Sequence, residues 1–112
     1  MSKTIWKFPI TVGDIITIEM PLYAEILTIQ SQFGEPMMWA LVDPKHVKET
    51  RYFEVFGTGH SVPELDDAKE RKYINTFQVH EGNLIFHLFE LKRKMAAPTF
   101  PADRQTLNME TV

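Results

Sequence analysis

The sequence contains no cysteine. Disulfide bonds, thiolate catalysis and zinc sites with cysteine ligands are therefore excluded. The sequence also lacks any apolar run close to the roughly 20 residues that a membrane-spanning helix needs. Its first residues lack the long apolar core and the small-residue cleavage site of a signal peptide. We therefore expect a soluble cytoplasmic protein that makes no membrane contact.

A strong charge of one sign is missing as well. Twelve Lys and Arg residues stand against fifteen Asp and Glu residues, which leaves a formal net charge of −3 at pH 7. A mildly acidic chain lacks the basic surface that binds a phosphate backbone, so we expect no general nucleic-acid binding. Hydrophobic residues make up 44% of the chain and charged residues 24%. This balance is typical of a folded globular protein, and 112 residues fit one domain with a modest core.

Helical periodicity is the third absence. Apolar residues instead alternate with a period of two in short segments bounded by Gly, Pro, Asn and Asp. Ile16, Ile18 and Met20, for example, alternate with Thr17 and Glu19. The predicted strands are 5–10, 15–20, 25–32, 37–43, 51–56, 73–79 and 84–91. About seven short strands predict an all-β fold, either a small antiparallel sandwich or a partly open barrel.

Two segments have a less definite pattern. Glu64 to Lys72 is highly charged, with acids before bases, and we expect either one or two helical turns or a mobile loop. After Leu91 the sequence has no period and contains two prolines. We therefore predict a single domain over residues 1–91 and a flexible tail over residues 92–112, or an arm that orders on a partner.

Two predicted strands are apolar on both faces. Residues 37–42 carry no polar side chain, and residues 84–89 carry only His87. A sheet in a protein of this size normally turns one face to water. Either these are central strands covered on both sides, or their outer face meets another subunit, so a homo-oligomer is one expectation.

The segment F-G-T-G-H, residues 56–60, has two interpretations. Backbone N–H groups around Gly57 and Gly59 could form a nest for an anion, with the Thr58 hydroxyl and the His60 imidazole as further donors. The segment lacks the lysine of a P-loop and the third glycine of a dinucleotide-binding loop. A turn that ends a strand is therefore the favoured interpretation.

Catalytic and metal-binding patterns are weak. A site built across strands from His60, His87 and an acid such as Asp66 or Glu90 is one hypothesis, but no two histidines have local metal-ligand spacing. His87 lies in the middle of an apolar strand and is more typical of a core or interface histidine. There is no G-x-S-x-G segment to position a nucleophilic serine. We expect no catalytic residue, no metal and no cofactor, and therefore no enzyme.

A planar ligand is another hypothesis. Aromatic rings stack on bases and amides read their edges. Residues of these types that could line a groove are Trp39, Tyr52, Tyr73, Asn75, Thr76 and Gln78. Arg51, Arg71 and Lys72 flank them and could meet phosphates. The favoured alternative is that all of these side chains belong to the core or to the strand surface.

Five segments occur in order and carry a resemblance. They are I-W-K-F-P-I at 5–10, W-A-L-V-D-P at 39–44, F-G-T-G-H at 56–60, Y-I-N-T-F-Q at 73–78 and F-H-L-F-E at 86–90. Together they resemble a family of small proteins encoded by bacteriophages and prophages, over about residues 5–90. The resemblance implies a phage accessory protein inside an infected bacterium and implies no activity. It also marks Thr76, Gln78, His87 and residues 57–60 as family positions.

These observations favour a non-enzymatic function. We expect a phage-encoded binding protein that modulates a host component, including a host defence system, by protein contact. The first alternative is a protein that sequesters a small molecule or a nucleotide signal, with Trp39 and the family positions as its ligand-binding residues. The second is a metal-dependent enzyme that uses His60 and His87. The third is a minor virion or assembly component.

Overall fold

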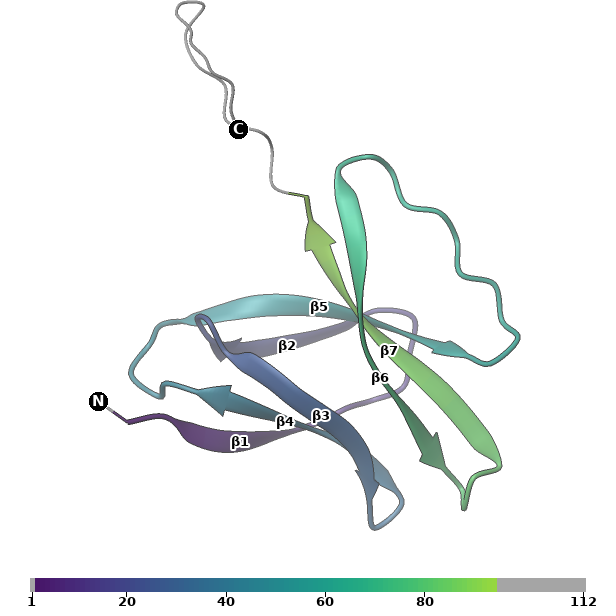
Figure 1. Ribbon diagram of the computed structural model, residues 1–112, viewed down its shortest axis with the longest axis horizontal. Coiled ribbons are helices and arrows are strands. Elements are labelled where there is room, and N and C mark those ends of the chain that lie inside the picture. The colour runs from purple at the N-terminus through teal and green to yellow at the C-terminus, as the bar shows by residue number, and fades with distance from the viewer. Residues whose placement is uncertain (1, 95–112) are drawn as a thin grey trace, which may run out of the picture.

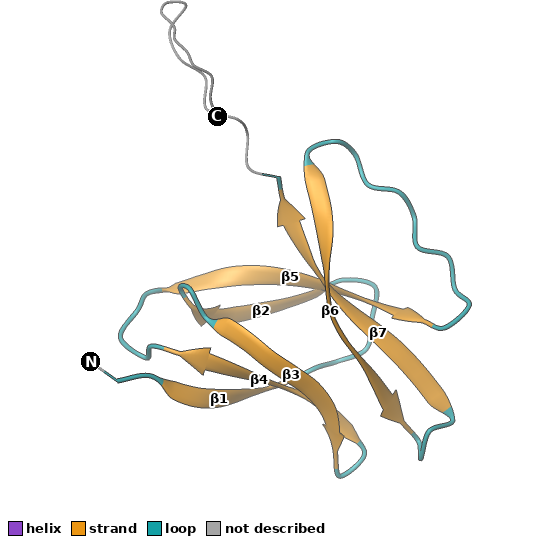
Figure 2. Cartoon of the chain, viewed as in Figure 1, coloured by secondary structure: helices purple, strands orange, loops and turns teal. Residues whose placement is uncertain are grey.

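The computed structural model describes residues 2–94 as seven strands joined by turns and loops (Figures 1 and 2). The strands are β1 (Thr4–Pro9), β2 (Ile16–Pro21), β3 (Glu25–Gln32), β4 (Glu35–Val42), β5 (Lys48–Gly57), β6 (Lys69–Val79) and β7 (Leu84–Arg93). The predicted all-β fold with about seven strands is confirmed. Within residues 2–94 no helix is long and apolar enough to cross a membrane.

Two antiparallel sheets make up the domain. The first has the strand order β1-β4-β3 and the second has the order β2-β5-β7-β6. The two sheets do not close into a barrel, and β3 of the first lies beside β6 of the second (Figure 1). The Ser31 hydroxyl donates to the Gln78 carbonyl across this junction, and the Asn75 amide donates to the Thr28 hydroxyl at 3.4 Å. The arrangement is compatible with the predicted sandwich.

The core lies between the two sheets and follows the period of two. Along β4, Met38, Ala40 and Val42 are fully buried, while the residues between them are only half-buried. Phe53 of β5 and Leu88 of β7 cover them from the second sheet. β4 and β7 are both internal strands of their sheets. An internal position pairs both edges of each strand but does not cover its outer face: Met37, Trp39 and Leu41 on β4 are half-buried, and Ile85 on β7 is exposed.

The connection between β5 and β6, residues 58–68, spans a long distance. Both strands are antiparallel to the β7 strand between them, so they run in the same direction and the chain must return the length of the sheet. The Arg71 guanidinium holds this connection by donating to the Pro63 carbonyl at 2.6 Å and to the Glu54 carboxylate at 2.6 Å. The connection therefore approaches the outer face of the second sheet at Pro63.

Some predicted boundaries are wrong. Glu64 to Lys72 forms no helical turn: the Asp66 carboxylate accepts the Ala68 N–H at 2.8 Å in a tight turn, and β6 begins at Lys69. β5 begins three residues earlier than predicted, at Lys48. β7 continues through Arg93, two residues into the predicted tail, and Lys94 donates its N–H to the Ala68 carbonyl at 2.8 Å. Residues 95–112 of that tail lie outside the described residues.

Candidate functional site

Three of the predicted site residues meet on the outer face of the second sheet. His87 of β7 pairs with Phe56 on one side and with Thr76 on the other. Its Nε2 atom lies 2.8 Å from the Thr58 hydroxyl, and its Nδ1 atom lies 2.8 Å from the Thr76 hydroxyl. The Tyr73 hydroxyl is 2.6 Å from Thr76. Thr58, His87, Thr76 and Tyr73 therefore form one hydrogen-bonded chain across β5, β7 and β6.

A β-bulge in β6 makes this chain possible. The register with β7 shifts between Tyr73 and Asn75, so that Ile74 is the extra residue. The bulge turns Thr76 to the same face as Tyr73, although residues three positions apart face opposite sides of a regular strand. The Asn75 carboxamide oxygen accepts the Thr76 N–H at 2.8 Å and fixes this geometry.

The hydrogen bonds of His87 are internal to the protein. A neutral imidazole carries one N–H donor and one acceptor nitrogen, and a threonine hydroxyl can meet either. Both ring nitrogens of His87 already have such a partner. The geometry therefore ties three strands together and leaves neither nitrogen facing an empty position.

The F-G-T-G-H segment forms a turn in which the N–H groups of Thr58 and His60 are hydrogen-bonded within the protein. The Thr58 N–H donates to the Ile85 carbonyl at 3.2 Å, and the His60 N–H donates to the Gly57 carbonyl at 3.0 Å. These N–H groups are not available to an anion. The ring of the exposed His60 lies over Gly57, 2.9 Å from where a Cβ atom would be, so a larger residue at Gly57 would displace this ring. Gly59 has a φ of +87°, which favours glycine.

The other predicted residues lie elsewhere. Trp39 is on β4 of the first sheet, opposite Lys7 and Thr28. The Gln78 side chain reaches the β6–β7 turn, with its Oε1 atom 3.1 Å from the position of a Cβ at Gly82. Among residues 2–94, no three His, Asp or Glu side chains are grouped closely enough to hold a metal ion.

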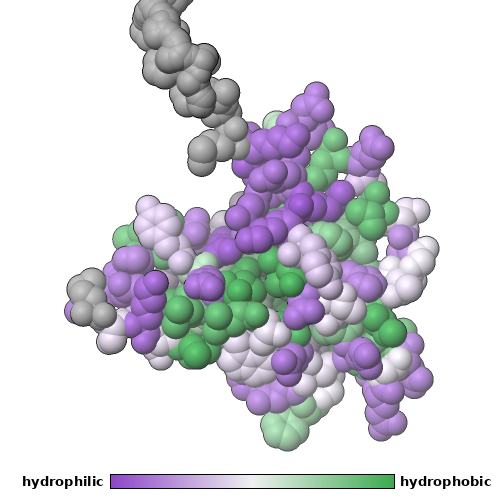
Figure 3. Space-filling view, viewed as in Figure 1, coloured by the Kyte–Doolittle hydropathy of each residue, from purple (hydrophilic) through white to green (hydrophobic). Residues whose placement is uncertain are grey.

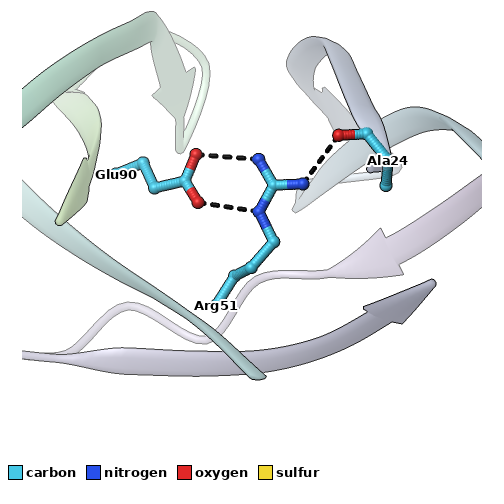
Figure 4. Close-up of polar contacts among 3 residues, drawn as sticks. All are labelled: Ala24, Arg51 and Glu90. Carbon is cyan, nitrogen blue, oxygen red and sulfur yellow. Dashed lines mark hydrogen bonds and ion pairs between the residues drawn. The ribbon is translucent and has the colours of Figure 1, made fainter. Parts of the chain in front are cut away.

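A different polar cluster lies inside the sandwich, at the end where the β2–β3 turn meets the end of β7 (Figure 4). Arg51 of β5 donates from Nε and Nη2 to the two carboxylate oxygens of Glu90, at 2.7 Å and 2.8 Å. Its Nη1 atom donates to the Ala24 carbonyl at 2.7 Å. Arg51 therefore joins two strands of the second sheet to the chain just before β3 of the first.

Burial strengthens this ion pair and makes the loss of either partner costly. Glu90 is only 4% exposed, and bidentate pairs between guanidinium and carboxylate groups have the best geometry for charge-assisted hydrogen bonds. The hydrogen bond to Glu90 raises the pKa of Arg51 above its usual value and outweighs burial, which lowers it. A buried ion pair loses several kcal/mol when one partner is removed, because the other charge is left uncompensated.

Two grooves open to solvent on either side of this pair. Tyr23, Tyr52 and Glu49 line one groove, of about 370 Å³. Glu25, Ile26 and Lys72 line the other, of about 400 Å³. Arg51, Glu90, Ala24 and Lys92 line both. We call this region the tyrosine end, defined by Tyr23, Tyr52, Arg51, Glu90 and Lys92.

Tyr23 is the unusual residue of the tyrosine end. It is 78% exposed, and its backbone has a φ of +67°. The left-handed conformation costs a residue with a Cβ atom about 1–2 kcal/mol. The ring contacts His46 edge-on, with 5.7 Å between the ring centroids. Neither burial nor backbone preference explains a large aromatic residue at this position.

A sequence pattern indicates the Arg51–Glu90 pair of this site. Arg51, Phe53 and Val55 fall on one face of β5, and Leu88 and Glu90 fall on one face of β7. A charge on the apolar face of a strand indicates a buried pair, because an unpaired buried charge is very costly. No sequence pattern predicts the exposure and positive φ of Tyr23, because a backbone angle cannot be read from the sequence.

Residues 1–98 match a family model described as "Domain of unknown function (DUF7352)". The chain belongs to this family. No curated protein and no solved structure matches the DUF7352 chain. The family model extends past the end of β7 and therefore covers both sheets, the tyrosine end and the hydrogen-bonded chain of His87.

Proposed function

We propose that this DUF7352 protein is a small binding protein that acts by contact with another protein through the tyrosine end. Tyr23 carries the proposal: a strained, exposed aromatic side chain lines one of two open grooves that share Arg51 and Glu90. Strained residues concentrate at functional sites. Tyrosine and arginine are the residues most enriched at the centres of protein interfaces.

The chemistry of the grooves favours a protein over a small ligand. Sites for small molecules are mostly apolar and bury most of the ligand surface. The grooves of the tyrosine end are open, and charged side chains of both signs surround them, with Lys92 and Lys72 against Glu49 and Glu25. Rims of mixed charge orient a protein partner and exclude wrong ones.

The resemblance to phage-encoded proteins gives the proposal its setting. The partner is then a component of the bacterial host, and the host's defence machinery is one such target. A rigid binding surface suits this role because little conformational entropy is lost on contact. The buried Arg51–Glu90 pair supplies that rigidity by holding the base of both grooves.

Capture from a bacterial lysate tests the proposal. Tyr23→Asn removes the ring while asparagine tolerates a positive φ, so we expect the folded protein to keep its stability within about 1 kcal/mol. His80→Asn is the matched control, since His80 is exposed and has a φ of +53° in the turn between β6 and β7.

We expect quantitative mass spectrometry to find a host protein that the wild type captures. Tyr23→Asn should lose it at least about tenfold, a typical effect of removing an interface aromatic residue, while His80→Asn should retain it. Equal capture by all three proteins would contradict a contact through Tyr23.

A further inference from the structure

The end of the sandwich opposite the tyrosine end exposes three large apolar side chains among polar ones. Val12 lies in the connection over residues 10–15, Phe33 lies in the β3–β4 turn, and Leu84 begins β7 directly after the β6–β7 turn. Residues of these three connections line one groove. Figure 3 shows a small pale green area at the β3–β4 turn, bordered by white and purple surface. We call this region the apolar end, defined by Val12, Phe33, Leu84 and the groove described below.

Phe33 is not explained by the fold of one chain. It is 98% exposed and has a φ of +53°, followed by Gly34 with a φ of +82°. Two-residue hairpin turns with both central residues at positive φ favour Asn, Asp and Gly. Phenylalanine therefore costs backbone energy there and gains no burial in return. An aromatic residue in this position is better explained by a contact with another molecule.

A groove lies directly beside Phe33. It has a volume of about 440 Å³. Its lining is mainly apolar, with Ile10, Val12, Pro36, Val79, Leu84 and Phe86, and also includes Thr11, Gly34, Glu35 and His80. Gly34 follows Phe33 in the same turn, so the projecting ring and the apolar groove belong to one end of the molecule.

We propose that the apolar end binds the apolar end of a second copy of this chain. A two-fold contact uses the same surface on both subunits, so that if residue i meets residue j, residue j also meets residue i. A surface that carries both a projecting ring and a groove beside it meets this condition. Phe33 of each copy enters the groove of the other.

The charges around the apolar end agree with a second copy. Acidic side chains, Glu35 and Glu81, are exposed at the turns. The Lys7 ammonium donates to Gln32 at 2.7 Å, next to Phe33. A rim with both signs can pair with itself, whereas a rim of one sign would repel its copy. An anionic membrane is disfavoured because it attracts basic clusters.

Pairing of strand edges is disfavoured by the sequence of the edges. β1 pairs only with β4 and β2 only with β5 within residues 2–94. Lys7 and Pro9 lie on β1, and Glu19 and Pro21 lie on β2. Charged residues and proline are the features that keep edge strands from joining other strands.

This contact is separate from the proposed function. Because the three connections of the apolar end come from both sheets, the contact clamps the sheets together. The dimer leaves a tyrosine end free on each copy, at its far side.

Sedimentation equilibrium over a wide range of protein concentration tests the dimer. We expect a concentration-dependent dimer for the wild type. Phe33→Asn, which relieves the backbone and removes the ring, should raise the dimer dissociation constant at least about tenfold. Leu84→Gln, on the same surface, should raise it as well. Tyr23→Asn, at the opposite end, should leave it unchanged.

Cross-linking locates the contact in the otherwise cysteine-free chain. A bismaleimide should join two copies of Glu35→Cys and should join Lys45→Cys, in the loop before β5, far less. A wild type that stays monomeric at the highest concentrations would overturn the proposal. So would a dimer that Phe33→Asn leaves intact. Phe33-dependent binding of a monomer to phosphatidylcholine vesicles would replace the second copy with a membrane.

Discussion

Replacing Arg51 with methionine removes the three hydrogen bonds that hold the tyrosine end together. The Glu90 carboxylate loses the two N–H donors of the Arg51 guanidinium, and the Ala24 carbonyl loses the third. A buried carboxylate without its partner costs about 3–5 kcal/mol. An orphaned buried carbonyl costs at least about 1 kcal/mol more. We therefore expect Arg51→Met to lower the free energy of unfolding by about 4–6 kcal/mol, a large part of the roughly 5–15 kcal/mol of a typical domain.

Removing both charges should restore most of this stability. Buried ion pairs replaced by apolar residues of similar volume are often neutral or stabilising. In the double variant Arg51→Met with Glu90→Leu, only the Ala24 carbonyl stays unpaired, so we expect a loss of about 1–2 kcal/mol. The favourable coupling between the two positions should therefore be several kcal/mol.

Urea unfolding of four proteins measures this coupling: the wild type, Arg51→Met, Glu90→Leu and the double variant. Tryptophan fluorescence reports the transition, because both tryptophans lie in the first sheet, on β1 and β4. Equal slopes of free energy against urea would show that the variants unfold from comparable native states. Single losses that simply add in the double variant, with a coupling below about 0.5 kcal/mol, would refute the reasoning.

Two further predictions concern pH and the F-G-T-G-H turn. The pKa of Arg51 is raised in the folded protein. The stability that its charge contributes is therefore fully present below the pKa of Arg51 in the unfolded chain. It is lost only as the pH rises through the higher pKa of Arg51 in the folded protein. Between about pH 7 and about pH 10, urea unfolding should therefore give a constant difference between wild type and Arg51→Met, and a difference that shrinks in this range would contradict the pKa shift. Gly59→Ala should lower the free energy of unfolding by about 1 kcal/mol because of the positive φ. His60→Ala should change it by less than about 0.5 kcal/mol because that side chain is exposed, and a larger loss than for Gly59→Ala would mean that the His60 ring matters more than the backbone.

The strands were predictable where they alternate. β2 and β3 carry apolar residues with a period of two, because one face of each meets the core. β4 is apolar throughout residues 37–42 and was predictable as a short apolar run that ends at Asp43-Pro44. The start of β5 was missed because Lys48, Glu49 and Thr50 are polar. They form a strand through their pairing with β2, in the register Lys48 with Pro21, and a tertiary pairing of this kind leaves no local pattern.

The site was harder to predict because it depends on tertiary geometry. Thr58, Thr76 and His87 are candidates from the sequence, and the structure brings them together in one hydrogen-bonded chain. Their contact requires a β-bulge and a strand order that sequence periodicity does not encode. Trp39, a candidate by residue type, and Gln78, which is also a position marked by the resemblance, lie elsewhere.

The tyrosine end was also hard to predict because it depends on tertiary geometry. Arg51 and Glu90 lie thirty-nine residues apart, and each was considered only as a flanking charge or as a metal ligand. Their shared inward direction on neighbouring strands indicates a pair, but only once β5 and β7 are known to be adjacent. Backbone strain at Tyr23 and Phe33 becomes visible only from the φ angles.

Photo-cross-linking from position 23 tests the central claim most directly. In the variant Tyr23→benzoylphenylalanine an aromatic ring remains at the tyrosine end and reacts on illumination with whatever lies against it. In bacterial cells the account predicts one discrete adduct between this variant and a host protein, and no such adduct from the same probe at His80. An absence of adducts at position 23, or the same adducts from both positions, would contradict a function exerted by protein contact at the tyrosine end.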